Sequence, residues 1–153
     1  MKKRLVTSQS ELDSIIQKCK VCYVGMVDLN HQPYVLPFNF GYKDQTFYLH
    51  SALEGKKMEI LKHNSKVCIA FSTDHQLSFQ SEDVACSFGM KFRSVVAFGN
   101  VAFIDEDEKK IEAMNIIMQK YTGKIFSYAT PAIRNVAVFK VLIDSISGKE
   151  LGY

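Results

Sequence analysis

The sequence has no tryptophan and only three prolines, and no apolar run reaches the roughly 18 residues that a membrane-spanning helix needs. The start of the chain also lacks the hydrophobic segment of a signal peptide, so we expect a cytoplasmic protein with four reduced cysteines. Neither sign of charge dominates, because the formal net charge is +3 and the basic run at residues 2–4 is typical of a solvated tail. The composition therefore argues against membrane and nucleic-acid partners.

Motifs for metal or nucleotide chemistry are missing as well. The chain contains neither a P-loop nor a glycine-rich dinucleotide loop, and no two of its four histidines have ligand spacing. Cys19 and Cys22 have the spacing of zinc and dithiol centres, but no second pair accompanies them, and they end a predicted helix instead of opening one. We therefore predict no metal and a structural role for this pair.

What the chain does contain is enough hydrophobic sequence, 47% over 153 residues, for a single domain covering residues 1–153. Hydrophobic periodicity and capping signals predict three helices, at residues 8–18, 56–64 and 106–121. Alternation and apolar runs predict six strands, at residues 21–28, 34–42, 46–51, 67–72, 90–104 and 136–146. The polar segment 73–82 is expected to be an exposed, mobile loop. The pattern favours a mainly β (α+β) fold, a small antiparallel barrel with helices outside.

The stretch from residue 34 to 57 carries the most chemical information. In its first strand bulky side chains from Tyr34 to Tyr42 alternate with small or polar ones, so one face has room for a flat ligand. Pro37 lies in the middle of this strand and removes a ladder donor, which restricts the strand to an edge or bulged position. An edge position of this kind is accessible to the rim of a ligand.

The second half of this stretch predicts an anion site. His50 and Ser51 come at the end of a strand, and the segment Gly55-Lys56-Lys57 follows them and begins a helix. Free backbone N–H groups and ammonium charges meet at such a helix start. Arg93 and Ser94, near the start of the long 90–104 strand, add further donors. Paired lysines on a helix are otherwise usually solvated, and that reading stays open for this segment.

Three segments carry a resemblance to a known family: YVLPFNFGY at 34–42, FYLHSALEGKK at 47–57 and ACSFGMKFRSVVAFG at 85–99. In order and spacing they resemble the flavin-binding split barrels related to pyridoxamine 5'-phosphate oxidase, in particular the nitroimidazole-resistance branch. The resemblance covers nearly the whole chain. It implies a six-stranded antiparallel split β-barrel with flanking helices and a single FMN-binding domain, with FAD as the other possible flavin.

The resemblance also implies roles for individual residues. Leu36, Pro37, Phe38 and Asn39 would lie along the isoalloxazine ring, while His50 and Ser51 would reach the ribityl-phosphate region. Lys56 and Lys57 would hold the phosphate, and Ser94 would bind the phosphate or the polar edge of the ring. Family members are typically homodimers with the flavin between subunits.

The chain departs from the oxidases proper at two places. It lacks their Arg-Leu-His motif and their C-terminal tryptophan and ends SGKELGY, so oxidation of pyridoxamine phosphate is not expected. Phe88 stands where the resistance branch often has tryptophan, which changes the expected shape of the substrate pocket.

The activity that the resemblance implies is that of a flavin-dependent oxidoreductase. It would pass electrons from a nicotinamide to a nitroaromatic or related small acceptor. His50 is the one nearby side chain that titrates near neutrality, so it is the candidate for proton relay, although a plain hydrogen bond to flavin or backbone is the alternative role. A non-catalytic flavin- or haem-binding carrier or sensor of the same fold is the alternative function.

Overall fold

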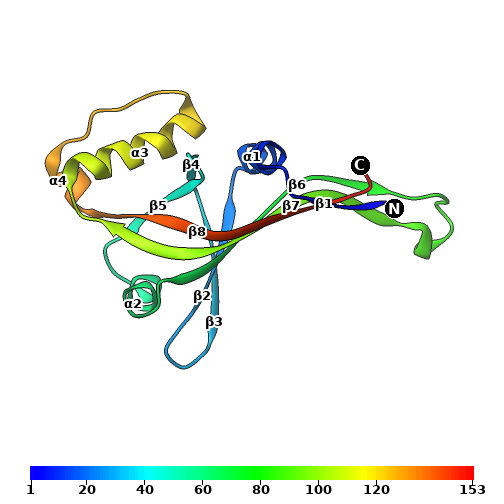
Figure 1. The fold of residues 1–153 in the computed structure, drawn as a ribbon, viewed down its shortest axis with the longest axis horizontal. Helices are drawn as coiled ribbons and strands as arrows, with labels where there is room; N and C mark the ends of the chain where they lie inside the picture. Colours follow the sequence, from blue (N-terminus) through cyan, green and yellow to red (C-terminus); the bar gives the residue numbers. More distant parts are fainter.

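The computed structural model describes residues 1–153 and contains one antiparallel sheet of eight strands (Figure 1). The strands are β1 (Lys3–Val6), β2 (Cys22–Val27), β3 (Pro33–Phe38), β4 (Gly41–Lys43), β5 (Thr46–Ala52), β6 (Lys66–Ser78), β7 (Gly89–Ile104) and β8 (Val136–Leu151). The helices are α1 (Gln9–Lys18), α2 (Lys56–His63), α3 (Asp107–Thr122) and α4 (Thr130–Arg134), with a short 3-10 turn η1 (Ala85–Ser87).

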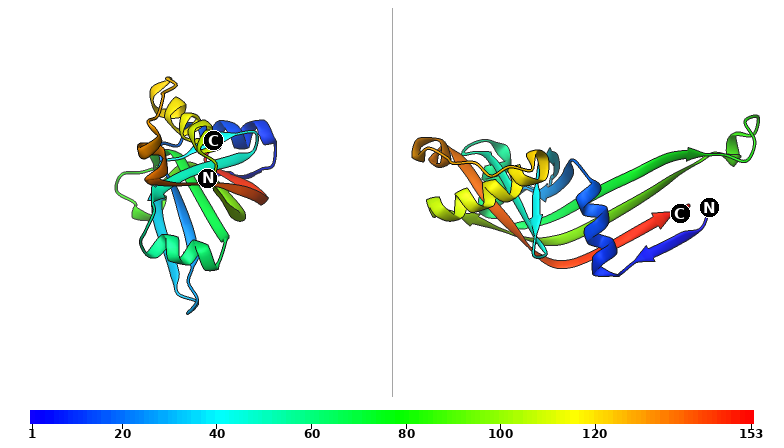
Figure 2. Two further views of the ribbon diagram at one scale, coloured as in Figure 1. Left: turned by 90° about the vertical axis from the view of Figure 1, so that its left-hand side faces the viewer. Right: turned by 90° about the horizontal axis from the view of Figure 1, so that it is seen from above.

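The strand order explains how the sheet closes into a split barrel. The order is β3-β2-β6-β7-β8-β5-β4, with β1 added alongside β8. The two central strands, β7 and β8, are 16 residues each and curve through the whole molecule (Figures 1 and 2). Phe38 of the edge strand β3 meets Phe139 of β8 edge to face, with ring centroids 6.2 Å apart, so distant parts of the strand order are in contact across the core.

Aromatic side chains fill the interior of the barrel. Phe40, Phe47 and Phe71 are fully buried, and the ring of Phe71 lies 5.0 Å from that of Phe40 and 5.1 Å from that of Phe47. Aromatic residues bury large apolar areas, so these rings supply much of the hydrophobic stabilisation. The strand at residues 21–28 was predicted to be apolar on both faces, but buried and more exposed residues alternate along β2, as they do along β5. Each of these strands therefore has only one face in the core.

The helices lie outside the sheet. α3 covers β4 and β5, and α2 lies on another side of the barrel, below β8 in the view of Figure 1. α3 approaches β4 so closely that a Cβ atom on Gly41 would lie 2.8 Å from the Ile116 side chain and 2.9 Å from the backbone nitrogen of Ile117. The glycine is therefore needed for packing at this point and not for a special backbone angle.

The fold class is confirmed, with eight strands in place of six. The predicted strand 34–42 is interrupted after Phe38 and continues as β4, and the charged segment Lys3–Val6 was not predicted as a strand. β1 forms because its residues pair with the end of β8, from Lys3 with Leu151 to Val6 with Gly148. This pairing is non-local, so it has no signal in the local sequence.

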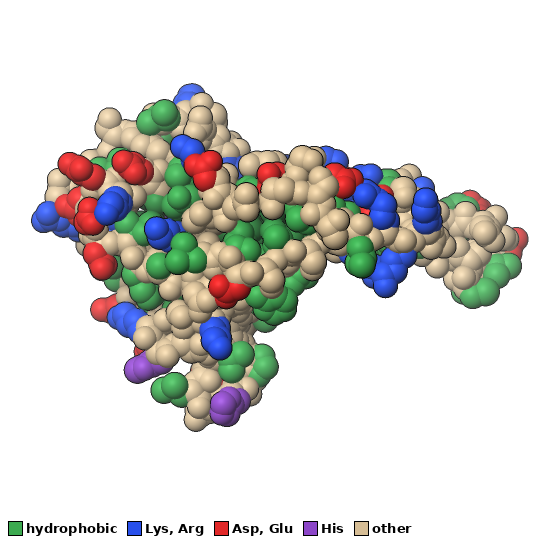
Figure 3. Space-filling view, viewed as in Figure 1, with side chains coloured by type: hydrophobic (Ala, Val, Ile, Leu, Met, Phe, Trp, Pro, Cys, Tyr) green, Lys and Arg blue, Asp and Glu red, His purple; other side chains and the backbone are tan.

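The prediction of a mobile loop at residues 73–82 was wrong for most of that segment. β6 continues to Ser78 and pairs with β7, for example Leu77 with Met90, after a register shift between Thr73 and Gln76. The two strands form an arm that projects from the barrel beside both chain termini (Figure 2). Hydrophobic side chains lie at the end of this arm (Figure 3), where the rings of Phe79 and Phe88 stack 4.8 Å apart.

Candidate functional site

The edge strand β3 presents an open face. It pairs only with β2 and ends the strand order, as the position of Pro37 predicted. Leu36 is half-buried and Phe38 is buried against the core, whereas Val35, Pro37 and Asn39 are exposed. The resemblance assigned four residues to the flavin ring. Of these, Pro37 and Asn39 point away from the core, whereas Leu36 and Phe38 pack toward it.

The start of α2 directs two lysines at this strand. Gly55, with φ of 111°, precedes the helix, and the carbonyl of Gly55 accepts the N–H groups of Met58 and Glu59. Lys56 Nζ lies 4.9 Å from the ring centroid of Tyr34, and Lys57 Nζ lies 5.8 Å from that of Phe38. The backbone N–H groups of a first helical turn have no acceptor within the helix. This helix start therefore has the donors and positive charge that an anion requires.

His50 lies on β5, the strand that precedes α2 in the chain. It lies opposite Val138 of β8, and its Nδ1 atom is buried without a hydrogen-bond partner. Burial lowers the pKa of His50, and the charge of Lys57 lowers this pKa further. A buried polar atom without a partner is uncommon in native proteins and points to a missing ligand or water. His50 is therefore a neutral imidazole near pH 7, with one atom available to a ligand.

Ser51 does not face the same way as His50. The two residues are neighbours on one strand, so their side chains project from opposite faces of the sheet. Ser51 is buried, and its hydroxyl donates to the carbonyl of Ala52 at 3.0 Å. The family resemblance assigned both residues to the ribityl-phosphate region, but only one of these two side chains can face a given side of the sheet.

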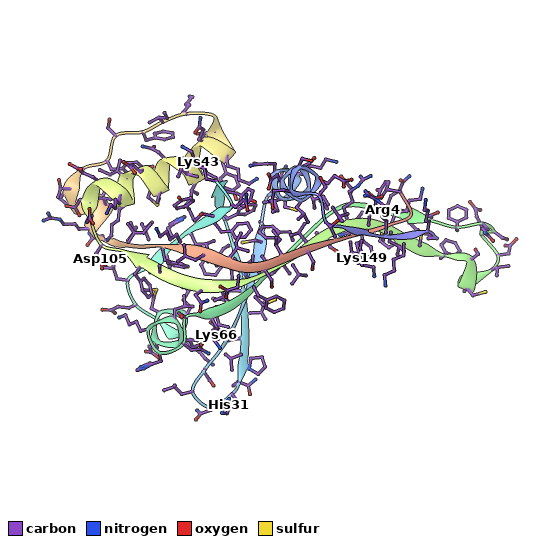
Figure 4. All side chains as sticks on the ribbon, viewed as in Figure 1. Arg4, His31, Lys43, Lys66, Asp105 and Lys149 are labelled. Carbon is purple, nitrogen blue, oxygen red and sulfur yellow. The ribbon has the colours of Figure 1, made fainter.

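Arg93 and Ser94 lie far from His50 along the strands of one chain. Ser94 pairs with Lys149, and His50 is level with Ile104 through Val138. Ser94 and Ile104 are ten residues apart on β7, on the order of 30 Å of strand. Figure 4 shows the same separation, because Lys149 of β8, which pairs with Ser94, and Asp105, which follows Ile104, are labelled far apart.

The guanidinium of Arg93 contacts two carboxylates and one aromatic ring. Its Nε donates to Glu150 at 2.8 Å, its Nη1 donates to Asp74 at 2.7 Å, and the group lies over the ring of Tyr153 at 3.9 Å. Arg4 donates to the same Glu150 carboxylate. Hydrogen bonds from both arginines hold the pKa of Glu150 below its usual range. In this chain Arg93 links β6 of the arm to the end of β8 through the carboxylates of Asp74 and Glu150.

The cysteine pair lies in the core. Cys19 and Cys22 are buried, and the thiol of Cys19 donates to the carbonyl of Ile15 at 3.3 Å. Burial raises the pKa of Cys22 to about 12, so its reactive thiolate form is scarce at neutral pH. No group of three or more His, Cys, Asp or Glu residues is arranged to hold a metal ion. The surroundings of the pair are those of structural thiols.

The position of His50 leads to a pH prediction. A histidine whose folded pKa is lowered binds fewer protons in the native than in the unfolded state, so the free energy of unfolding should fall as the pH drops below about 6.5. His50→Gln should make the pH dependence of stability weaker in this range. Urea unfolding at pH 7.5 and 5.5 for parent and variant measures the difference, with His31→Gln, an exposed histidine, as the control. Identical pH dependence in the parent and the His50 variant would contradict the burial of this group.

Comparison with known proteins identifies the family. Residues 8–150 match the family model described as pyridoxamine 5'-phosphate oxidase. The chain belongs to this family. A crystal structure described as that of a candidate 5-nitroimidazole antibiotic resistance protein from Bacteroides thetaiotaomicron VPI-5482 is 44% identical, with a TM-score of 0.88 over 97% of this chain and 87% of that chain. Within the family, the chain falls on the nitroimidazole-resistance branch, as its motifs indicated.

More distant members share the fold alone. A FAD-binding protein from Mesorhizobium loti is 24% identical, with a TM-score of 0.71 over 99% of this chain and 100% of that chain. A FAD- and haem-binding protein from Mycobacterium smegmatis is 17% identical, with a TM-score of 0.84 over 97% of this chain and 74% of that chain. Among curated proteins none matches. None of the helices combines the length and hydrophobicity needed to cross a membrane.

Proposed function

We propose that the protein is a flavin-dependent oxidoreductase that passes electrons from a nicotinamide to a nitroaromatic or related small acceptor. The observation that carries the proposal is the pair Lys56 and Lys57 at the start of α2, whose ammonium groups lie over two rings of the edge strand β3. The 44% identity to a protein described in terms of nitroimidazole resistance supports the choice of acceptor.

The residues at this site fit a flavin. The edge of β3 exposes Pro37 and Asn39, an apolar side chain and an amide, which suits a flat ring with a polar edge. The lysines lie over Tyr34 and Phe38, on the other face of the strand, so a ligand that contacts both groups crosses the edge of the sheet. Lys57 and the N–H groups of the first turn of α2 would bind the phosphate. The unpartnered Nδ1 of His50 would gain a hydrogen bond from the ligand. A bound flavin supplies the hydride and electron transfer chemistry that no side chain provides.

His50 has two possible roles in such a site. As a neutral imidazole it accepts a hydrogen bond and holds the ligand in place, and near its pKa it also takes up and releases a proton at a ring nitrogen. Lys57 favours the neutral form by its charge. It would also place positive charge near the bound ligand, where negative charge collects on reduction.

A homodimer with the flavin between its subunits is part of the proposal. Arg93 and Ser94 are remote from His50 of their own chain, so a site that uses all three residues requires a second copy. The outer face of the β3-β2-β6-β7 half is also apolar: register aligns Val35, Gly25, Cys68 and Phe98 in one row. Val35 is 59% and Phe98 is 53% exposed. Exposed apolar patches of this kind are typical of protein interfaces.

The activity is tested with the purified, flavin-loaded protein. Oxidation of NADH and NADPH is followed in the presence of a nitroimidazole and compared with the same concentration of free flavin. We expect turnover faster than that of the free flavin for at least one donor. Turnover no faster than free flavin would contradict the oxidoreductase and favour the carrier, and a haem absorption band in the purified protein would identify haem as the cargo.

A further inference from the structure

A pocket of about 240 Å³ lies where α1, β4 and α3 meet, and none of the residues assigned above to the flavin lines it. It is lined by two lysines, two amides, one tyrosine and one isoleucine, and by no carboxylate. These residues are Gln17 of α1, Tyr42 and Lys43 of β4, and Ile116, Gln119 and Lys120 of α3. The charge of the lining is therefore positive, and this pocket is separate from the proposed flavin site.

Lys120 is half-buried and has no acidic partner. Its Nζ donates to the carbonyl of Gln17 at 2.9 Å, lies 4.5 Å from the ring centroid of Phe40 and forms no salt bridge. An ammonium group has three donors, so two of them remain for a ligand or water. Burial lowers the pKa of Lys120, because the charged form has lost part of its hydration. A partly desolvated charge of this kind is stabilised by an anion.

The other titratable groups around this pocket do not neutralise Lys120. Cys19 and Cys22 interact with it, but burial raises the pKa of both thiols, so both are uncharged near pH 7. Asp13 does not line the pocket, and its Oδ1 atom accepts a hydrogen bond from the hydroxyl of Tyr42 at 2.7 Å. The negative charge that Lys120 lacks is therefore not supplied by these neighbours.

The remaining polar side chains of the pocket add donors. Lys43 lies on β4 beside α3 and forms no salt bridge, so it brings a second positive charge (Figure 4). Gln17 and Gln119 have amide side chains, each with an NH₂ group. The volume is below the roughly 300 Å³ at which pockets for drug-sized ligands begin. A ligand that suits this lining is small, negatively charged and rich in acceptors.

We propose that the pocket between α1, β4 and α3 binds a small oxyanion, a carboxylate or inorganic phosphate, with Lys120 as its main partner. The oxygens of both anions accept charge-assisted hydrogen bonds from ammonium groups. A bound anion would connect α3 to α1 and β4, because residues from all three elements line the pocket. The inference concerns a site outside the proposed flavin site and does not depend on the proposed function.

The site is tested by urea unfolding of the protein in increasing sodium phosphate and, separately, sodium acetate, with sodium chloride keeping the ionic strength constant. A ligand that binds only the folded state raises the free energy of unfolding by mass action, so the rise with concentration gives a dissociation constant. The two titrations show which of the two anions the pocket binds. We expect a saturable rise with at least one of them.

Lys120→Met removes the charge and keeps an aliphatic side chain over Phe40. The variant should bind the anion at least about tenfold more weakly, the ratio that one charge-assisted hydrogen bond provides. Lys124→Met is the matched control, because Lys124 is exposed just beyond α3 and does not line the pocket. Phosphate also stabilises proteins by exclusion from their surface, and this effect is common to both variants.

The pKa of Lys120, followed by NMR of labelled lysine side chains, is a second measurement. It should rise when the anion is added, because a nearby negative charge favours the ammonium form. Equal dissociation constants for the parent and Lys120→Met, or no saturable effect of either anion, would overturn the inference. An anion effect that is lost in Lys57→Ala and kept in Lys120→Met would place the ion at the start of α2 and also overturn it.

Discussion

Replacing Lys57 by alanine is expected to weaken flavin binding by about 1.5–3 kcal/mol, the usual worth of a charge-assisted hydrogen bond. Lys57 Nζ lies over the Phe38 ring at 5.8 Å and has no carboxylate partner, so its charge is available to a phosphate. The affinity is measured by titrating flavin-free parent and variant with FAD and FMN. Lys57 faces the flavin side of the helix start, so both flavins should lose affinity.

Lys62→Ala is the matched control for this substitution. Lys62 lies on the same helix and is exposed, but it is not one of the two lysines that lie over rings of β3. It also does not line the groove between α2 and the turn that joins β2 to β3. A second measurement is the pKa of His50, which should rise in Lys57→Ala because the lysine charge lowers it. An unchanged flavin affinity together with a shifted His50 pKa would remove Lys57 from the phosphate site while confirming its proximity to His50.

The second large effect is a thermodynamic link between flavin binding and dimerisation. A ligand that contacts both subunits binds only the dimer and stabilises it by mass action, by about 2.7 kcal/mol when free flavin is a hundredfold above its dissociation constant. The exposed row from Val35 to Phe98 and the remote position of Ser94 are the structural reasons to expect this. Sedimentation velocity over a dilution series should show that flavin-free protein dissociates at higher concentration than flavin-loaded protein.

The Lys57→Ala variant provides a control for the linkage. At a fixed flavin concentration it should show a smaller shift of the dimer dissociation constant than the parent, because less of it is loaded. Phe98→Asp should weaken the dimer with or without flavin, since Phe98 is 53% exposed on the apolar face. Equal dimer dissociation constants with and without flavin in the parent would place the ligand within one subunit and withdraw Ser94 from a shared site.

Much of the fold could be predicted because its signals are local. The alternation along β3, the apolar stripe of α3 and the glycine that ends that helix each depend on residues close together in the chain. The edge position of β3 also followed from one residue, Pro37, which cannot donate to a ladder. The strands that were missed or cut short, β1 and the outer part of β6, depend on partners far along the chain.

The residues of the candidate site also fall into two groups, those placed by local sequence and those placed by contacts between distant elements. His50, Lys56 and Lys57 lie within eight consecutive residues, so a strand followed by a helix was sufficient to bring them together. Arg93 and Ser94 were added because of their chemistry, and the register of β7 with β8 places them at the other end of a long strand. A groove beside Lys56, between α2 and the turn that joins β2 to β3, was not predicted. Its two walls come from different elements, and neither wall carries a sequence motif.

By itself, the sequence determined the family, the mainly β barrel and the segment that bears the lysines, since each depends on local periodicity or on a contiguous motif. Only the tertiary structure decided that Arg93 is engaged by Glu150 and Asp74, and that Lys56 and Lys57 lie over the rings of Tyr34 and Phe38. The physical reason is that the direction of a side chain and the identity of its partners depend on strand register and helix phase. Both are set by contacts between elements that are distant in the chain.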